Sequence, residues 1–283
     1  MTGIIPTVDQ VDELHRRICP SEAAWDLIHT HCVIVATIAR QLARRRNALF
    51  MRRCTLPPDA SEWGGRHAVT CAADDASGDG RMGVDDGVSA SEASPQDVEG
   101  LHSPTEGFLV PPTGGVTGGT IPPRLIDEHL VVIGGLLHDI GTYRVLSSDG
   151  SEGGPLRFDG SRYIRHGLLG YEYLLEQGVD ESIAEFARNH TGVGLTKERV
   201  EAQGLALPPA DYVPVNLEQE TVMVADKYHS KSVPPRFLTA EAYARKAARF
   251  GEDNRGQWLE LVAAYGEPDV DDMARRFDMT LSR

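Results

Sequence analysis

The sequence predicts an all-α fold, a bundle of roughly eight to ten helices. Three observations support this prediction. Apolar residues recur at intervals of three and four through most of the chain, and strand-like alternation is nearly absent. Residues typical of helix N-caps precede several of these segments, and one long stretch rich in glycine, proline and serine interrupts the helical pattern.

The helices can be placed from their caps. Thr7 and Gln10 form a capping box for a short helix that ends near Arg17, and Ser21 begins a longer helix that runs to Arg46. Later caps are Asp180 and Asn216 with Gln219. Further helices are expected from residue 125 onward and over 161–177, 181–190, 217–230, 239–250, 252–265 and 268–278.

The change in composition after residue 46 predicts the organisation of the chain. Residues 47–122 are crowded with glycine, proline, serine and aspartate, which is typical of a disordered or loosely ordered insert. We therefore expect N-terminal helices over 1–46, the insert over 47–122, the remainder of one helical domain over 123–250, and C-terminal helices over 251–283 that pack on the same core.

Length and charge limit the classes of function. The chain has 283 residues, with 42 acidic and 28 basic side chains and a net charge of −14, which argues against a nucleic-acid polymer or an anionic membrane as the main partner. The four cysteines show no paired spacing that would indicate a disulfide framework or a zinc ribbon. Because no signal-peptide pattern or long apolar run is seen, we expect a cytoplasmic protein.

Histidines and aspartates interrupt the apolar helix faces. A single buried histidine is more often hydrogen-bonded to a carbonyl than bound to a metal, but a buried carboxylate without a partner is costly. Four imidazoles and two carboxylates together can hold two divalent ions and leave positions open for water. Two such ions can activate a water for attack at phosphorus. The six candidate ligands are His31, His138, Asp139, His166, His190 and Asp226.

The segment "GGLLHDIG", which contains His138 and Asp139, resembles a known motif. Together with His31 upstream and Asp226 in "VADK", it is similar to the H…HD…D signature of the HD superfamily of metal-dependent phosphohydrolases. "RHGLLGYEY" and "RNHTG" resemble the parts of its binuclear subgroup that carry two extra histidines.

The resemblance covers approximately residues 20–46 and 124–250. His31 and His138 stand 107 positions apart, so the segment 47–122 looks like an insertion between the first two ligand helices.

The resemblance implies a division of roles. One metal ion would be held by His31, His138, Asp139 and Asp226, and a second by Asp139 as a bridge with His166 and His190. The ions would be divalent transition metals, Fe or Mn first, with Co, Ni or Zn as alternatives. Asp139, Lys227 and Arg144 are the catalytic candidates. The substrate-binding candidates are Arg144, Arg165, Lys227, His229 and Ser230; the last two follow Asp226 by three and four positions and therefore project from the same helical face.

Three functions are compatible with these residues. The first is hydrolysis of a small phosphorylated substrate, a nucleotide or dinucleotide, by water activated at the metals. The second is a di-iron oxygenase that resembles myo-inositol oxygenase, which uses the same six ligand types. The third is a non-catalytic, metal-dependent nucleotide sensor, which ranks last because all six candidate ligands are present. The expected partner is a small phosphorylated molecule, neither a nucleic-acid polymer nor a membrane is expected, and the sequence does not specify the oligomeric state.

Overall fold

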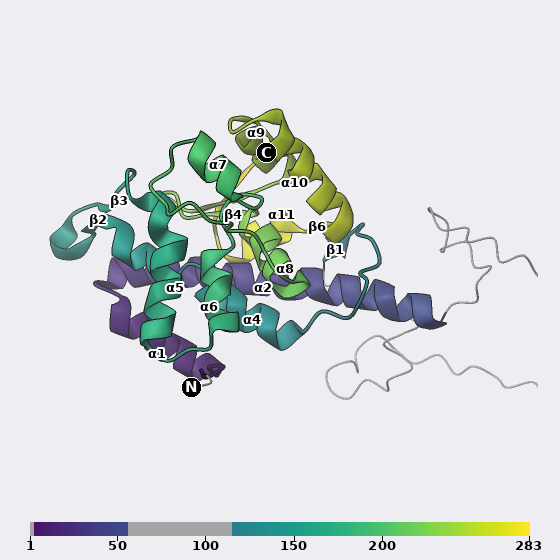
Figure 1. The fold of residues 1–283 in the computed structure, drawn as a ribbon, viewed down its shortest axis with the longest axis horizontal. Helices are drawn as coiled ribbons and strands as arrows, with labels where there is room; N and C mark the ends of the chain where they lie inside the picture. Colours follow the sequence, from purple (N-terminus) through teal and green to yellow (C-terminus); the bar gives the residue numbers. More distant parts are fainter. Residues whose placement is uncertain (1–2, 56–114) are drawn as a thin grey trace, which may run out of the picture.

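A computed structural model describes residues 3–55 and 115–283 (Figure 1). Most of these residues lie in helices, which confirms the predicted all-α class. The α-helices are α1 (Val8–Ile18), α2 (Glu22–Thr55), α4 (Glu128–Leu137), α5 (His166–Glu176), α6 (Glu181–Arg188), α7 (Lys197–Ala202), α8 (Leu217–Asp226), α9 (Ala240–Ala248), α10 (Glu252–Tyr265) and α11 (Val270–Arg276). The described residues also include the 3₁₀ helices η2 (Ile140–Val145), η3 (Ser151–Gly153) and η4 (Tyr163–Arg165).

Short strands lie between these helices. They are β1 (Val116–Thr117), β2 (Leu146–Asp149), β3 (Leu156–Phe158), β4 (His229–Ser230), β5 (Arg236–Leu238), β6 (Glu267–Pro268) and β7 (Thr280–Ser282). β2 and β3 pair antiparallel, as do β1 and β6. In the three-stranded sheet, β5 pairs antiparallel with β4 and parallel with β7. These strands are too short to produce a detectable alternation in the sequence.

The predicted helix caps are present in the structure. The Thr7 hydroxyl accepts from the Gln10 N–H at 3.3 Å, and the Gln10 side chain accepts from the Thr7 N–H at 2.9 Å. Ser21 Oγ accepts from the Ala24 N–H at 3.1 Å at the start of α2. Side chains also cap α6 and α8, where Asp180 and Asn216 accept from backbone N–H groups. The local polar signals therefore set these starts, because each cap satisfies a backbone donor that has no partner inside its helix.

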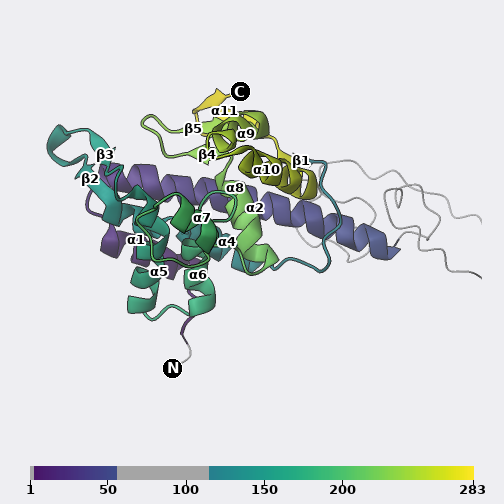
Figure 2. The ribbon, with the colours of Figure 1, turned by 45° about the horizontal axis from the view of Figure 1, so that its top comes forward.

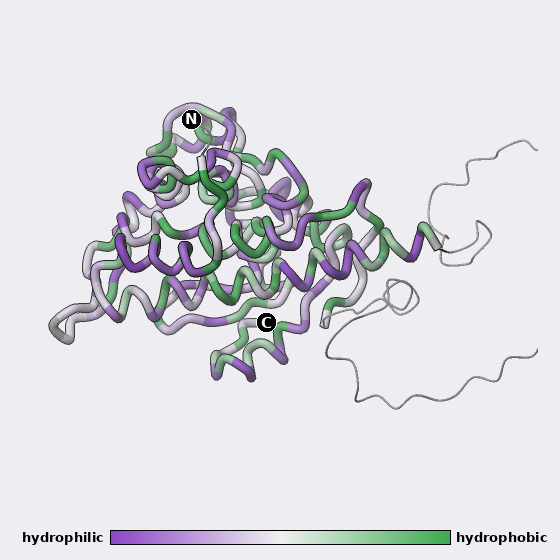
Figure 3. The backbone as a smooth tube through the Cα atoms, turned by 90° about the horizontal axis from the view of Figure 1, so that it is seen from below, coloured by the Kyte–Doolittle hydropathy of each residue, from purple (hydrophilic) through white to green (hydrophobic). Residues whose placement is uncertain are grey.

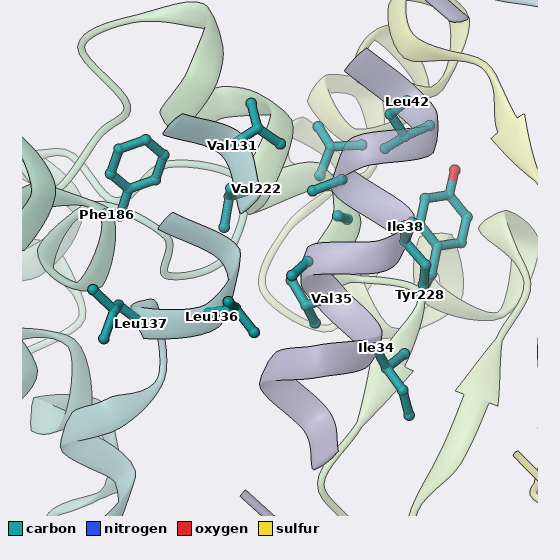
Figure 4. Close-up of a cluster of buried hydrophobic side chains, with 14 of the residues drawn as sticks. Ile34, Val35, Ile38, Leu42, Val131, Leu136, Leu137, Phe186, Val222 and Tyr228 are labelled. Carbon is teal, nitrogen blue, oxygen red and sulfur yellow. The ribbon is translucent and has the colours of Figure 1, made fainter. Parts of the chain in front are cut away.

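Helix α2 is the central element of the bundle. Figures 1 and 2 show it running through the molecule, with α4 and α8 packed along it. Its residues Ile34, Val35, Ile38 and Leu42 are buried in one apolar cluster with residues of α4 and α8, and Phe186 of α6 lies on the other side of α4 (Figure 4). Each such side chain stabilises the fold by about 1.5–3 kcal/mol when fully buried. Figure 3 shows hydrophilic and hydrophobic positions interchanging along the helices, the pattern expected when one face of each helix is buried.

Two glycines allow the end of α4 and the residues after it to lie close to the backbones of α2 and α5. A Cβ at Gly135 would meet the backbone of Ala36 in α2 at 2.7 Å. A Cβ at Gly141 would collide with the carbonyl oxygen of His166 and the backbone nitrogen of Gly170 in α5. The "GGLLHDIG" segment is therefore held against two helices at backbone contact distance.

The predicted insert differs from the structure at its edges. Residues 47–55 continue α2, and Asn47 exchanges two hydrogen bonds with the backbone of Ile126, at 2.9 and 2.8 Å. Val116 in β1 is buried and pairs with Pro268. The composition boundary was therefore too wide at both ends. Residues 47–55 contain no glycine, proline, serine or aspartate and belong with the helix before them, and a buried two-residue strand is too short to change the composition of its surroundings. The rest of the insert, 56–114, lies outside the described residues, and its character stays a prediction.

Two further outcomes concern boundaries and membranes. Helix α8 ends at Asp226, whereas the sequence predicted it to continue to residue 230. Among the described helices, none has both the length and the apolarity required to cross a lipid bilayer.

Candidate metal centre

The six predicted ligands converge from separate parts of the chain. His31 lies in the N-terminal third of α2, His138 and Asp139 follow α4, and His166 begins α5. His190 comes just after α6, and Asp226 ends α8. They form two groups in which the candidate ligand atoms all lie within 4.8 Å of one another: His31, His138, Asp139 and Asp226, and Asp139, His166 and His190.

The first group surrounds the Nε2 atom of His31. This atom lies 2.9 Å from Asp139 Oδ2, 3.1 Å from Asp226 Oδ1 and 3.2 Å from His138 Nε2. His138 Nε2 lies 3.4 Å from Asp139 Oδ2 and 3.5 Å from Asp226 Oδ1. All four side chains are buried except that of Asp226, which is 15% exposed. Two imidazoles and two carboxylates thus face one point.

The second group shares Asp139 but uses its other oxygen. His166 Nε2 and His190 Nε2 lie 3.4 and 3.5 Å from Asp139 Oδ1, and 3.0 Å from each other. Oδ2 of the same carboxylate faces the first group. The Thr142 hydroxyl donates to Oδ1 at 2.9 Å and helps to fix this orientation. Asp139 is therefore placed between the two groups.

Three of the histidines are oriented by the same local contact. Nδ1 of His138, His166 and His190 lies 2.7, 2.6 and 2.7 Å from the carbonyl oxygen three residues earlier in the chain. A carbonyl only accepts hydrogen bonds, so Nδ1 carries the proton. In a neutral ring the lone pair is then on Nε2, which faces the centre. This is the arrangement expected of a metal-ligating histidine.

His31 is oriented differently. Its Nδ1 lies 2.8 Å from Nδ1 of His229, a buried residue in β4. His229 was expected on the helical face of Asp226, and this was wrong because α8 ends at Asp226. Strand β4 nevertheless places His229 next to Nδ1 of His31. Burial and the neighbouring His31 lower the pKa of His229 to about 2, so its ring is neutral.

Burial controls the charge of the ligand histidines. It lowers the pKa of His166 and of His190 to about 3, and that of His31 well below its ordinary value. His138 is the exception, since burial opposes its charge but the contact with Asp226 outweighs burial and raises its pKa. For Asp226, burial is outweighed by Lys227 and the two histidines, which hold its pKa well below its ordinary range. The centre thus combines mainly neutral imidazoles with ionised carboxylate.

The donor set fits divalent metal ions. In the neutral state, His166 and His190 direct two lone pairs at each other across 3.0 Å, and no proton is available between them. A cation between such atoms removes the repulsion. Ligand atoms at right angles around an ion, with bonds of about 2.1 Å, lie about 3 Å apart. Imidazole and carboxylate together suit first-row transition metals.

A protein-family comparison agrees with this geometry. The family model described as the HD domain matches residues 116–231. The chain contains an HD domain. The match includes five of the six clustered residues and leaves out His31, which reaches the cluster from α2, on the other side of residues 56–114.

Several curated proteins are similar to parts of this chain. An uncharacterised protein of Methanocaldococcus jannaschii is 44% identical over 101 residues, which are 36% of this chain and 49% of that protein. Two proteins named tRNA (cytidine(56)-2′-O)-methyltransferase are also similar. The one from Picrophilus torridus is 37% identical over 100 residues, 35% of this chain and 24% of that protein. The one from Thermoplasma volcanium is 34% identical over 150 residues, 53% of this chain and 33% of that protein.

These matches therefore span half or less of each relative's length. No solved structure matches the chain.

Lys227 lies beside the His/Asp cluster of the HD domain. Its ammonium donates to Asp226 Oδ2 at 2.7 Å and to the carbonyl oxygen of His190 at 2.9 Å. Burial opposes the charge of Lys227, but Asp226 outweighs burial and raises its pKa. An ammonium has three N–H donors, so one remains for a ligand.

Lys231 was missed by sequence analysis. Its ammonium contacts Asp139 Oδ2 and lies 3.4 Å from His31 Nε2. Burial lowers its pKa to about 7. Lys231 follows His229 by two positions, and residues two apart share a face of an extended segment. Alternation beyond Asp226 would have indicated this placement, but the sequence was interpreted there as a helix.

Two arginines do not reach the cluster. Arg144 donates to Glu176 Oε2 at 2.8 Å and lies over the ring of Tyr173 at 5.1 Å. The prediction that Arg144 acts at the metals was wrong, because η2 turns its side chain toward α5. Arg165 is half-buried and is absent from the walls of the described pocket. Its expected substrate contact is therefore not observed.

The HD domain opens to solvent through a pocket of about 330 Å³. His166, His190 and Asp226 lie on its inner wall, and Lys227, Lys231 and Lys246 add three ammonium groups. The predicted residues His229 and Ser230 also line it. The apolar lining is Ile164, Val193, Leu195, Leu205, Leu238, Ala247 and Phe250. The pocket therefore joins a metal-binding wall to cationic and apolar surfaces.

Proposed function

We propose that the protein is a metal-dependent phosphohydrolase acting on a small phosphorylated molecule, a nucleotide or dinucleotide. The observation that carries this proposal is the position of the His/Asp cluster on the wall of a pocket that also contains three lysine ammonium groups. In this proposal the six residues hold two divalent ions, with Asp139 as the bridge. Bound ions of this kind acidify a water and offset charge on phosphate oxygens.

The lysines have distinct tasks in this proposal. Lys227 is held by Asp226 and by the carbonyl of His190, so its remaining N–H is directed without a further loss of side-chain freedom. It would donate to a phosphate oxygen. Lys246 is exposed in α9, where its ammonium lies 5.9 Å from the ring centre of Tyr243. It would meet the phosphate as the substrate enters. A neutral polyol, the type of substrate that the oxygenase alternative would use, would not require these charges.

The remaining walls suit a nucleoside. Phe250 is 64% exposed at the pocket, and Leu238 lies nearby in the lining. Aromatic and aliphatic surfaces of this kind contact the face of a base. The volume of about 330 Å³ fits a small molecule. Two relatives are named for tRNA methylation, but a third or less of each is matched, so we include a short RNA in the test rather than assign it as substrate.

The test is hydrolysis by the full chain reconstituted with Mn²⁺ or Fe²⁺, followed as released phosphate for phosphomonoesters and as nucleotide products separated by chromatography for dinucleotides and the oligoribonucleotide. Substrates would be mononucleotides, dinucleotides, sugar phosphates and a short oligoribonucleotide, each assayed in air and under nitrogen. We expect turnover of a nucleotide or dinucleotide without oxygen. Asp139→Asn should abolish this turnover, and Asp253→Asn, an exposed carboxylate in α10, is the matched control that should retain it.

Two results would overturn the proposal. Strict dependence on oxygen would favour the di-iron oxygenase. Binding of nucleotides with full metal loading but without turnover of any substrate in the panel would favour the sensor.

A further inference from the structure

A second concave region adjoins the metal pocket. It has a volume of about 320 Å³ and shares Ser230, Leu238 and Lys246 with the pocket. Its full lining is Ser230, Arg236, Leu238, Ala242, Arg245, Lys246, Arg249, Ser282 and Arg283. We call this region the basic groove. Five of its nine lining residues are cationic and none is acidic, although the chain as a whole has a net charge of −14.

One helix supplies much of this charge. Ala242, Arg245, Lys246 and Arg249 occur at intervals of three, four and seven positions, so they lie on one face of α9. Arg236 faces them from β5. The sequence places like charges at helical neighbours, where they repel and weaken the helix. Such a cluster is stabilised when an anion binds it.

The cations of the groove differ in their protein partners. Arg245 donates to Glu241 at 3.0 Å, and Arg283 lies 2.5 Å from a carboxylate oxygen of Asp271. Within residues 3–55 and 115–283, Arg236, Lys246 and Arg249 form no ion pair.

The charges at the junction influence one another. The Lys246 side chain is exposed overall, but neighbouring atoms partly desolvate its ammonium. This desolvation, and then the charges of Lys227, Arg236 and Arg249, lower the pKa of Lys246 against an opposing effect of Asp226. The charge of Lys246 therefore interacts with charged groups of the metal pocket on one side and with the groove arginines on the other.

Strand pairing fixes the groove next to the cluster. Arg236 pairs with Ser230, and Phe237 pairs with His229. His229 in turn lies 2.8 Å from His31. A ligand that spans the pocket and the groove therefore needs no more than the length of a small molecule, since Lys246 and Ser230 line both.

We propose that the basic groove is a second phosphate subsite, formed by Arg236 and Arg249 with Lys246 at its junction with the pocket. It holds a phosphate of the substrate other than the one at the metal centre. This inference rests on the proposed function and narrows its substrate class to nucleotides that carry two separated phosphate groups. Arginine suits this task because its planar guanidinium can donate two parallel hydrogen bonds to phosphate oxygens.

The test compares substrates that differ by one phosphate. The kcat/KM of adenosine 3′,5′-bisphosphate is divided by that of the better of adenosine 5′-monophosphate and adenosine 3′-monophosphate. We expect a ratio of about ten or more for the wild-type holoenzyme, the equivalent of one or two charge-assisted contacts at a solvated site. The double variant Arg236→Gln/Arg249→Gln should lower the ratio to near one. Arg255→Gln, whose arginine faces Glu252 in α10, is the control and should keep the ratio.

Each outcome separates this inference from the proposed function. A wild-type ratio near one, or a ratio that the double variant does not change, overturns the subsite while hydrolysis stands. If none of these nucleotides is hydrolysed, the same bisphosphate is titrated into the full chain, with and without Mn²⁺, by calorimetry. Weakening of about tenfold in the double variant but not in Arg255→Gln supports the subsite. Equal binding by all three proteins, or equal loss in both variants, overturns it.

Discussion

His15 in α1 and His190 just after α6 are both buried, but their surroundings differ. Where α1 packs on the core, His15 has a partner for each ring nitrogen, with Nε2 2.8 Å from the carbonyl oxygen of Leu136 and Nδ1 3.2 Å from the hydroxyl of Tyr143. In the metal centre, Nδ1 of His190 faces a carbonyl of its own helix end, and Nε2 faces another nitrogen, that of His166, at 3.0 Å.

The difference shows what identifies a ligand histidine. Burial is common to both regions, so it does not distinguish them. The second nitrogen does: where it has a hydrogen-bonding partner the ring is part of the core, and where it faces another lone pair the site requires a cation. The predictions below test this distinction.

The largest effect is expected where the two ligand groups meet. Asp139→Ala should remove all measurable turnover and release both ions, because each carboxylate oxygen faces a different group. Metal analysis of the purified variant, together with the phosphate-release assay, measures both effects. A variant that keeps two ions per chain would show that Asp139 is not the bridge.

A smaller loss is expected from single histidines. His166→Ala and His190→Ala should each lower the metal content from about two ions per chain to about one, since each imidazole offers one nitrogen to one ion. His15→Ala should keep the full metal content. Loss of metal in His15→Ala, in protein that remains folded by circular dichroism, would remove the distinction between the two regions.

Lys231→Met tests whether a cation is needed at Asp139. In metal-free protein the variant should lose about 3–5 kcal/mol of unfolding free energy, because a buried carboxylate loses its ammonium partner. Added Mn²⁺ should restore most of this loss. Urea unfolding with EDTA and with Mn²⁺ measures the effect, and Lys246→Met, which removes an exposed ammonium without an ion-pair partner in the described chain, is the control. Equal destabilisation under both conditions would contradict the expectation.

His15→Gln tests the closed region through pH. Burial lowers the pKa of His15 to about 4, so the folded protein holds it neutral while the unfolded chain binds a proton below about 6.5. Its stabilisation is present above pH 6.5 and is lost as the pH falls toward 4. The loss totals about 3 kcal/mol.

The glutamine of His15→Gln does not titrate. The gap in unfolding free energy between wild type and variant should therefore shrink between pH 7 and pH 4, while metal content at pH 7 is unchanged. A gap that stays constant over this interval would mean that His15 is not held neutral in the folded state.

The smallest effect is expected outside both regions, at Arg144. Its pair with Glu176 is partly exposed, so Arg144→Gln should change the unfolding free energy by about 0–1 kcal/mol. It should change kcat/KM less than about twofold, because the side chain faces α5 and not the pocket. A large loss of kcat/KM would return Arg144 to the phosphate-binding set.

Helical spacing indicated which histidines and aspartates face the core, but it was the resemblance to the HD signature that selected the six clustered residues among them. Helical spacing was not sufficient for the groups that follow Asp226. Helical phase loses its meaning where α8 ends, so Ser230 and His229 were assigned to the wrong element, and Lys231 was overlooked.

The prediction for Arg144 was wrong for a related reason. A count of five residues from Asp139 gives no direction once the chain enters a 3₁₀ helix. The orientations of the His138, His166 and His190 rings also could not be predicted from the sequence. Each depends on a carbonyl three residues earlier, which is available only at the end or the start of a helix.

The close approach of Gly141 to α5 has a consequence for laboratory evolution of this protein. Gly141 follows Asp139 by two residues and contacts the backbone beside His166 and Gly170, so it sets how far apart the two ligand groups stand. Libraries selected for turnover of new substrates should retain Gly141 and Gly170. They should accept changes at Phe250, which lines the pocket just after α9. Substrate preference can then be altered by selection while the spacing of the metal ligands is inherited unchanged.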